Sequence, residues 1–279
     1  MNAGSPNSPW RAGNRIRLLE NGEEFYPEAF QAIAGAQTEI LLETFIWFED
    51  KVGLELHRLL VAAAARGVRT EVTVDGYGSP GFASEFLHAL TAAGVKLRVY
   101  DPHRSVFGMR LHVFRRLHRK LLVIDAHRAF VGGLNYSADH LGDFGPQSKQ
   151  DYAVAIEGPV VADIHHFALA AIRNNGSAER WRQPWRVPAD GADRQPGNAT
   201  VRFEIRDNAL RSNAIERQYR AAIRAARSEI VIANAYFFPG YQFLHALKQA
   251  ARRGVRVALI LQGEPDKPVV KSIARALYR

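Results

Sequence analysis

The sequence predicts an α/β fold: a sandwich of helices around a mixed β-sheet, followed by an incomplete second copy of the same unit. Two features support this prediction. Strand-like apolar segments alternate with helix-length segments that end at glycine, and two sequence patterns recur in the same order along the chain. The chain has 279 residues, of which 47% are hydrophobic. That is enough for one large or two modest globular domains.

The elements of the first unit follow one another in a regular order. Helices are recognised by a glycine after their last turn, because glycine readily adopts the left-handed backbone that closes a helix. Strands are recognised by apolar runs or by alternation of apolar and polar residues. The predicted strands are Glu39–Phe48, Val68–Asp75, Lys96–Tyr100, Leu117–Asp125, Ala129–Val131 and Tyr152–Ile156, and the predicted helices are Leu54–Arg66, before Gly67, and Phe82–Ala93, before Gly94.

Composition divides the chain into four segments. Residues 1–15 are mostly polar or small and are predicted to form a flexible N-terminus. Residues 16–173 form the first domain. Residues 174–198 are rich in proline, glycine and asparagine and are predicted to be a linker. Residues 199–279 form the incomplete second domain.

The internal repeat supports this division. Glu39–Phe48 resembles Glu229–Phe238, and Ala65–Arg69 resembles Arg252–Arg256. In both cases the two copies are separated by about 190 residues. Two elements that recur in the same order at nearly the same separation indicate a duplicated unit rather than a chance match.

The residues that carry chemistry lie between positions 117 and 136. His118 and Lys120 are two residues apart, so on a strand both side chains lie on the same face. Glycines further along allow a close backbone approach. The other members of this group are Asp125, Gly132, Gly133 and Asn135.

This combination of side chains suits attack on a phosphodiester. A neutral imidazole is a nucleophile that can form a covalent phospho-enzyme intermediate. An ammonium group and amide donors can stabilise the charge that develops on the non-bridging oxygens. No metal or other cofactor is expected, because the ammonium and amide groups take the place of a metal ion. The chain has no cysteine, which excludes disulfides and thiolate metal sites.

The spacing His118-x-Lys120-x4-Asp125-x6-Gly132-Gly133-x-Asn135 resembles the signature motif of the phospholipase D superfamily. Within it, the chain most resembles the bacterial cardiolipin synthases of the B type. The resemblance covers almost the whole chain and implies the phospholipase D-like α/β/α sandwich. The segments that carry it are Glu43–Trp47, Asp75–Gly78, Gly132–His140, Phe144–Pro146 and Ala233–Pro239.

The resemblance also implies roles for the site residues. His118 would be the nucleophile or the general acid, and Lys120 and Asn135 would bind the phosphate. Asp125 would complete the catalytic motif as a supporting carboxylate, because strand alternation turns it away from His118. Many superfamily members have serine at the position of Gly133.

Asp151 is the candidate for the carboxylate that orients the imidazole of His118. It lies just before the predicted strand Tyr152–Ile156. The alternative is a surface acid at the start of a strand, and the sequence does not decide between the two.

The net charge of +9 and the pI of about 10.0 suit a polyanionic partner, either nucleic acid or an anionic membrane. The resemblance favours a membrane that contains phosphatidylglycerol over nucleic acid, and it leaves oligomer formation open. The segment Pro102–Ile124 alternates arginines with apolar residues, as a membrane-interface loop or an ordinary packed loop would. No stretch of about 20 apolar residues is present, so we expect a peripheral protein on the cytoplasmic side of the cell membrane.

Three functions follow as hypotheses. The first is a cardiolipin synthase that converts two phosphatidylglycerol molecules to cardiolipin and glycerol through a phosphohistidine intermediate. The repeat places the counterpart of His118 at about position 306, beyond Arg279, so a truncated chain with weak or no activity is expected. The second is a nuclease of the same superfamily that acts as a dimer. The third is a non-catalytic fragment that binds an anionic membrane.

Overall fold

The computed structural model describes residues 9–79, 81–100, 105–106, 109–110, 117–173, 195–206, 213–235 and 237–261. The chain divides into two compact units, Met1–Phe203 and Glu204–Arg279, which are described separately below. Three parts of the sequence named above lie outside the described residues: most of the predicted linker (174–194), residues 102–104, 107–108 and 111–116 of the predicted membrane-interface loop, and the residues after 261.

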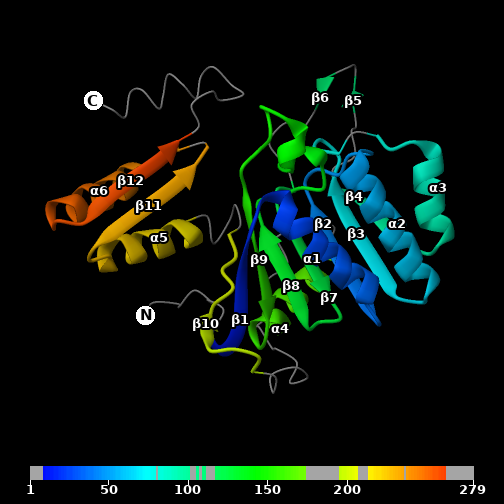
Figure 1. The fold of residues 1–279 in the computed structure, drawn as a ribbon, viewed down its shortest axis with the longest axis horizontal. Helices are drawn as coiled ribbons and strands as arrows, with labels where there is room; N and C mark the ends of the chain where they lie inside the picture. Colours follow the sequence, from blue (N-terminus) through cyan, green and yellow to red (C-terminus); the bar gives the residue numbers. More distant parts are fainter. Residues whose placement is uncertain are drawn as a thin grey trace. The chain divides into compact units, whose positions relative to one another are not determined.

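The first unit is built on an eight-stranded mixed sheet (Figure 1). Its two parallel pairs lie at one side of the sheet, and all the other neighbouring strands of the sheet pair antiparallel. In spatial order the strands are β10 (Ala199–Val201), β1 (Arg11–Glu20), β9 (Tyr152–Glu157), β8 (Arg128–Gly132), β7 (Leu121–Ile124), β2 (Glu39–Thr44), β3 (Arg69–Asp75) and β4 (Lys96–Tyr100). A two-residue strand pair, β5 (Ser105–Val106) and β6 (Met109–Arg110), stands outside this sheet.

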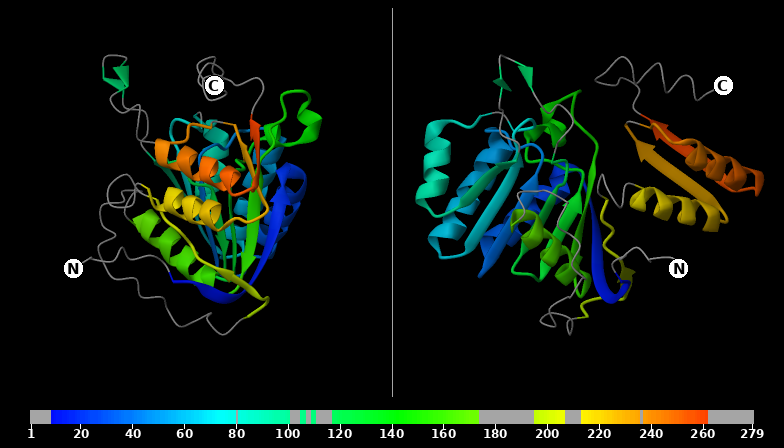
Figure 2. Two further views of the ribbon diagram at one scale, coloured as in Figure 1. Left: turned by 90° about the vertical axis from the view of Figure 1, so that its left-hand side faces the viewer. Right: turned by 180° about the vertical axis from the view of Figure 1, so that it is seen from behind.

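Helices cover both faces of the sheet (Figures 1 and 2). α1 (Asn21–Gly35) and α2 (Lys51–Ala65) pack side by side on one face, with α3 (Ser84–Ala92) next to α2, whereas α4 (Val160–Arg173) lies on the other face. Two single 3₁₀ turns follow β8, η1 (Ala138–His140) and η2 (Gly142–Phe144). The predicted α/β/α sandwich with a mixed sheet is therefore confirmed.

The sequence explains the central elements directly. All six residues of β2 are buried, as expected for a strand covered on both faces. Asp50 caps α2 by accepting hydrogen bonds from the backbone of Val52 and Gly53. The helix ends before Gly67, whose φ is +89°. The largest fully buried side chains, Trp47, Tyr136 and Phe130, lie in or beside this centre.

Three predicted boundaries need correction. β1 begins at Arg11, so it includes the last five positions of the segment predicted to be flexible. Its exposed arginines interrupt the apolar pattern by which a strand is recognised. Two of these arginines form ion pairs with Glu157 and Glu28. The strand predicted over Leu117–Asp125 is regular only in β7. β10 pairs with β1, so residues 199–203 belong to the first unit and not to the second.

The second unit contains α5 (Ala214–Ala225), β11 (Glu229–Asn234), α6 (Tyr241–Arg252) and β12 (Arg256–Leu261), with β11 and β12 parallel. Its details repeat those of α1–β2–α2–β3. Arg66 donates to the backbone carbonyls of Ala34 and Ala36 at the C-terminal end of α1, and Arg253 does the same at the C-terminal end of α5.

The strand pairs repeat as well. In the first unit Glu39 is the register partner of Arg69 and forms an ion pair with it, and Glu229 and Arg256 do so in the second. Shared helix caps and ion pairs support the duplication that the sequence repeat predicts.

Candidate functional site

The topology brings the predicted site residues to one end of the sheet. Because β7 runs antiparallel to β2, the start of β7 lies beside the end of β2, and β8 ends and β9 begins at the same edge. His118 and Lys120 precede β7, Gly132 ends β8, and Asp151 precedes β9. Residues from three separate segments therefore meet there.

His118 and Lys120 lie together, as the sequence predicts. The Nζ atom of Lys120 is 3.4 Å from both ring nitrogens of His118 and 3.3 Å from its carbonyl oxygen. The ring of Phe45 lies 4.7 Å from the imidazole and 5.3 Å from Lys120 Nζ. His118 is exposed, whereas Lys120 is only 9% exposed. A solvent-facing imidazole thus sits on a largely buried cation.

Burial lowers the pKa of Lys120 to about 8, and the nearby carboxylate of Asp151 opposes that shift. Lys120 therefore carries its charge below about pH 8 and loses it as the pH rises through that value. A charge held at low dielectric attracts an anion more strongly than one in water does, so this ammonium group suits a bound phosphate.

Asn135 is held with its amide in one orientation. The backbone N–H of Ile46 donates to Asn135 Oδ1 at 3.0 Å, which turns the amide nitrogen the other way. Its backbone is held on both sides, by Tyr26 Oη, which donates to its carbonyl at 2.8 Å, and by its own N–H, which donates to His140 Nε2 at 3.3 Å. Burial lowers the pKa of His140, which favours the neutral ring that can accept this hydrogen bond.

The two glycines make room for their neighbours. A Cβ on Gly132 would lie 2.5 Å from the backbone of Tyr152 and Ala153. A Cβ on Gly133 would lie 2.2 Å from Asp151 Oδ1 and 2.4 Å from Oδ2. The carboxylate of Asp151 is therefore packed directly on Gly133, and a side chain at that position would displace it.

We predict that Gly133→Ser moves this carboxylate. Overpacking should lower the free energy of unfolding by about 1–3 kcal/mol. The pKa of Lys120 should also fall below about 8, because the carboxylate that raises it is displaced. Urea denaturation and an NMR titration of the lysine side chain measure the two effects. Gly35→Ala is the control, since nothing lies within 4 Å of its Cβ position; an unchanged Lys120 titration in Gly133→Ser would contradict the prediction.

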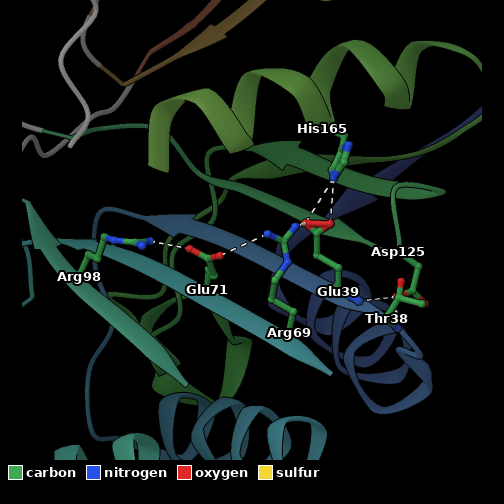
Figure 3. Close-up of polar contacts among 7 residues, drawn as sticks. All are labelled: Thr38, Glu39, Arg69, Glu71, Arg98, Asp125 and His165. Atoms are coloured by element: carbon green, nitrogen blue, oxygen red, sulfur yellow. Dashed lines mark hydrogen bonds and ion pairs between the residues drawn. The ribbon is translucent and has the colours of Figure 1, made fainter. Parts of the chain in front are cut away.

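Asp125 is not brought to the other site residues. It follows β7, seven positions from His118, which corresponds to about 20 Å along an extended chain. Its carboxylate accepts hydrogen bonds from the backbone N–H groups of Gln37, Thr38 and Glu39 and from the Thr38 hydroxyl (Figure 3). Burial acts to raise its pKa, but these hydrogen bonds lower it overall. Asp125 thus lies away from His118, as strand alternation predicts, and its carboxylate anchors the turn between α1 and β2. Its part in the catalytic motif stays a prediction.

A row of charged side chains crosses the sheet face under α4 (Figure 3). Glu39 accepts from His165 at 3.0 Å and forms an ion pair with Arg69. Glu71 continues the row, 3.5 Å from Arg69 and 2.7 Å from Arg98. Histidine at position 165 is therefore packed against a carboxylate. Within the described ranges no group of three or more His, Cys, Asp or Glu side chains could hold a metal ion.

Comparison with known proteins identifies the family. The model for the cardiolipin synthase, PLD-like domain matches residues 29–168 and 219–279. The chain belongs to the cardiolipin synthase family of PLD-like proteins. Cardiolipin synthase B from Escherichia coli (strain K12) is 58% identical to it over 270 residues, which is 96% of this chain and 65% of that protein.

More distant members agree with this assignment. Cardiolipin synthase A from Pseudomonas syringae pv. syringae is 32% identical over 281 residues, covering 98% of this chain and 55% of that protein. The chain thus spans less than two thirds of the length of these curated relatives. The phosphatidylserine synthase of Haemophilus influenzae Rd KW20 shares the fold, with a TM-score of 0.66 at 14% identity over 98% of this chain and 71% of that one.

In this member of the cardiolipin synthase family, the structure adds residues that sequence reasoning missed. Asp75 is buried and accepts a hydrogen bond of 2.6 Å from the backbone N–H of Leu117, next to His118. Asn21 exchanges two hydrogen bonds of 2.9 Å with the backbone of Asp151. Asp75 stands in a segment already singled out for its resemblance, but nothing in the sequence links Asn21 to a residue 130 positions away.

We predict that Asn21→Gly makes the position of Asp151 less fixed. Asn21 has a φ of +54°, which glycine also adopts, so this substitution removes the side-chain hydrogen bond without adding backbone strain. The free energy of unfolding should fall by about 1 kcal/mol, and the pKa of Lys120 should shift downward. Gln150→Ala is the matched control, because it removes a partner of the Asn21 side chain but leaves the bond to Asp151. Equal effects of the two substitutions would argue against a positioning role for Asn21.

Proposed function

We propose that the chain carries one His–Lys half of a phosphatidyltransferase active site. The complete enzyme would convert two phosphatidylglycerol molecules to cardiolipin and glycerol. The observation that carries this proposal is the exposed imidazole of His118 on the buried ammonium of Lys120, in a member of the cardiolipin synthase family.

In the first step, a ring nitrogen of His118 attacks the phosphorus of phosphatidylglycerol. The new P–N bond replaces the P–O bond to the headgroup glycerol. The glycerol oxygen takes a proton as it leaves from a second histidine, the role that we give to the counterpart of His118 in the second copy of the repeat. In the second step, a hydroxyl of another phosphatidylglycerol attacks the phosphatidyl-histidine, passes its proton to that second histidine and releases His118. The products are cardiolipin and glycerol, and neither step needs a cofactor.

Two groups stabilise the negative charge that builds up on the phosphoryl oxygens. Lys120 supplies a fixed positive charge from below the imidazole, and Asn135 supplies an amide nitrogen whose direction is set by Ile46. Gly132 and Gly133 keep this side of the site free of side chains. We assign Asp151 the positioning role: its carboxylate, packed on Gly133, supports the charge of Lys120 and is proposed to orient His118.

We place the protein at the cytoplasmic surface of the cell membrane as a peripheral protein. Its proposed substrate is an anionic membrane lipid, and the chain is strongly basic. Of the helices in the described ranges, none has both the length and the apolar character needed to cross a bilayer.

Two incubations test the proposal against the nuclease alternative, for which the basic charge is equally suitable. The chain is incubated with vesicles of labelled phosphatidylglycerol and, separately, with plasmid DNA. We expect cardiolipin formation, or retention of a labelled phosphatidyl group on the protein, without nicking of the plasmid. Nicking without either lipid reaction would reject the phosphatidyltransferase and assign a nuclease.

A further inference from the structure

The second unit contains a groove whose residues the proposed reaction does not use. It lies between α5 and α6 and has a volume of about 380 Å³. Arginines line it from both sides, with an aromatic side chain, a histidine and amides between them, and no acidic residue lines it. The lining residues are Arg220, Arg224, Tyr241, Gln242, His245, Ala246, Gln249 and Arg253.

Comparison with the first unit shows that this chemistry is not a requirement of the fold. When the two copies are aligned on their shared arginine caps, Arg220 corresponds to Phe30 and Arg224 to Ala34. Phe30 packs on the core and stacks against Tyr26. The first copy therefore fills this position with an apolar ring, and the second copy replaces it with a cation.

The same holds for the opposite wall of the groove. Tyr241 corresponds to Leu54 and Gln249 to Ala62. Tyr241 is 82% exposed and stacks on His245 with ring centroids 6.1 Å apart. Only Arg253 keeps the structural role of its counterpart, since its guanidinium is bound to backbone carbonyls after α5. Compared with the first copy, the groove thus gained positive charge and an exposed aromatic side chain. Arg220 also has structural contacts, since it donates to Gln242 on the opposite wall and forms an ion pair with Glu216.

Its surroundings have the same character. Between Ala214 and Arg253 the sequence has two acidic residues, Glu216 and Glu229, and seven basic ones. Tyr219, on α5, is 59% exposed. Arginines beside exposed tyrosines are typical of surfaces that meet anionic lipid headgroups, because a tyrosine ring can enter the interface while its hydroxyl stays in water. The basic residues are Arg217, Arg220, Arg224, Arg227, Lys248, Arg252 and Arg253.

We infer that the α5–α6 groove is a docking surface for the phosphate headgroups of an anionic phospholipid membrane, formed by residues that are not part of the His118 site. This inference rests on the proposed function for the choice of lipid over nucleic acid. Headgroup phosphates would contact Arg220 and Arg224, and Tyr241 would lie at the headgroup level. The surface would hold the protein on the membrane that contains its substrate.

Co-sedimentation with vesicles tests the inference. Each arginine removed near an anionic surface should weaken binding about fivefold at low ionic strength, so Arg220→Gln with Arg224→Gln should weaken binding to phosphatidylglycerol vesicles about 25-fold. The control is Arg17→Gln with Arg58→Gln, which makes the same change in charge at two exposed arginines of the first unit. Phosphatidylcholine vesicles and duplex DNA serve as further ligands.

Two outcomes would overturn the inference: equal loss in the groove variant and the control, or loss of DNA binding without loss of vesicle binding. Arg220→Lys with Arg224→Lys keeps the charge and should bind as the unaltered chain does. If the double glutamine variant unfolds the second unit, Arg224→Gln alone is tested, since the Arg224 side chain is exposed. Vesicle binding should then weaken about fivefold. Unchanged vesicle binding would refute the docking role of the groove. A His118→Asn chain should still bind vesicles, which separates failure of this surface from failure of the catalytic proposal.

Discussion

Replacement of His118 by asparagine is expected to lower phosphodiester turnover by at least about 1,000-fold, because it removes the proposed nucleophile of a covalent mechanism. Asparagine keeps a planar polar side chain of similar reach but cannot form a stable bond to phosphorus. His118 is exposed, so the free energy of unfolding should change by no more than about 0.5 kcal/mol. Loss of activity would then reflect chemistry and not stability.

The assay for this variant should not depend on the protonation of the leaving group. Bis(4-nitrophenyl) phosphate is suitable, since the nitrophenolate leaves without a proton at neutral pH. His127→Asn is the matched control: His127 is exposed and lies just past the far end of β7. Retention of most of the turnover by His118→Asn, or an equal loss in both variants, would remove His118 from the role of nucleophile.

Replacement of Lys120 by methionine is expected to lower turnover about 100- to 1,000-fold and, at the same time, to stabilise the fold. The loss of turnover follows from removing the positive charge that is proposed to stabilise the phosphoryl oxygens. The gain in stability follows from the pKa of Lys120, which falls from 10.5 to about 8 on folding. Burying the ammonium at pH 7 therefore opposes folding, by up to about 3 kcal/mol, and methionine fills the site without that cost.

The sign of the pH dependence follows from the same shift. Between pH 8 and 10.5 the unfolded chain binds more protons at Lys120 than the folded chain does, so the stability of the unaltered chain rises with pH across this window. The advantage of Lys120→Met should therefore be complete below pH 8 and disappear near pH 10.5. Turnover by the unaltered chain should fall as the pH rises through about 8. Urea denaturation at pH 7 and 10 measures the first effect, and equal stability gains at both values would contradict the assignment.

The central elements of the fold could be predicted from the sequence because their signals are local. The apolar run of β2, the glycine after α2 and the recurrence of Glu39 as Glu229 are all visible along the chain. β1 could not be predicted, since its arginines face solvent or pair with acids elsewhere in the chain. When the polar side chains of a strand pair with residues that are distant in the sequence, the strand shows no alternation of apolar and polar residues.

The candidate site divides in the same way. His118, Lys120 and Asn135 were predicted from their spacing, and the structure brings His118 and Lys120 together. Asp125 belongs to the same motif, yet its carboxylate binds the backbone of residues 37–39. Asn21 contributes through a contact between segments 130 positions apart. Short-range spacing thus predicts which residues are chemically notable, whereas long-range contacts decide which of them lie together and which hold the backbone elsewhere.

One measurement tests the central claim most directly: mass spectrometry of the chain after brief reaction with bis(4-nitrophenyl) phosphate and a quench under alkaline conditions, which preserve phosphohistidine. The account predicts a nitrophenyl-phosphoryl adduct on the peptide that contains His118, absent from the His118→Asn chain. An adduct on a different residue would contradict it. So would release of nitrophenolate by the His118→Asn chain at the same rate as by the unaltered chain, with no adduct on that peptide.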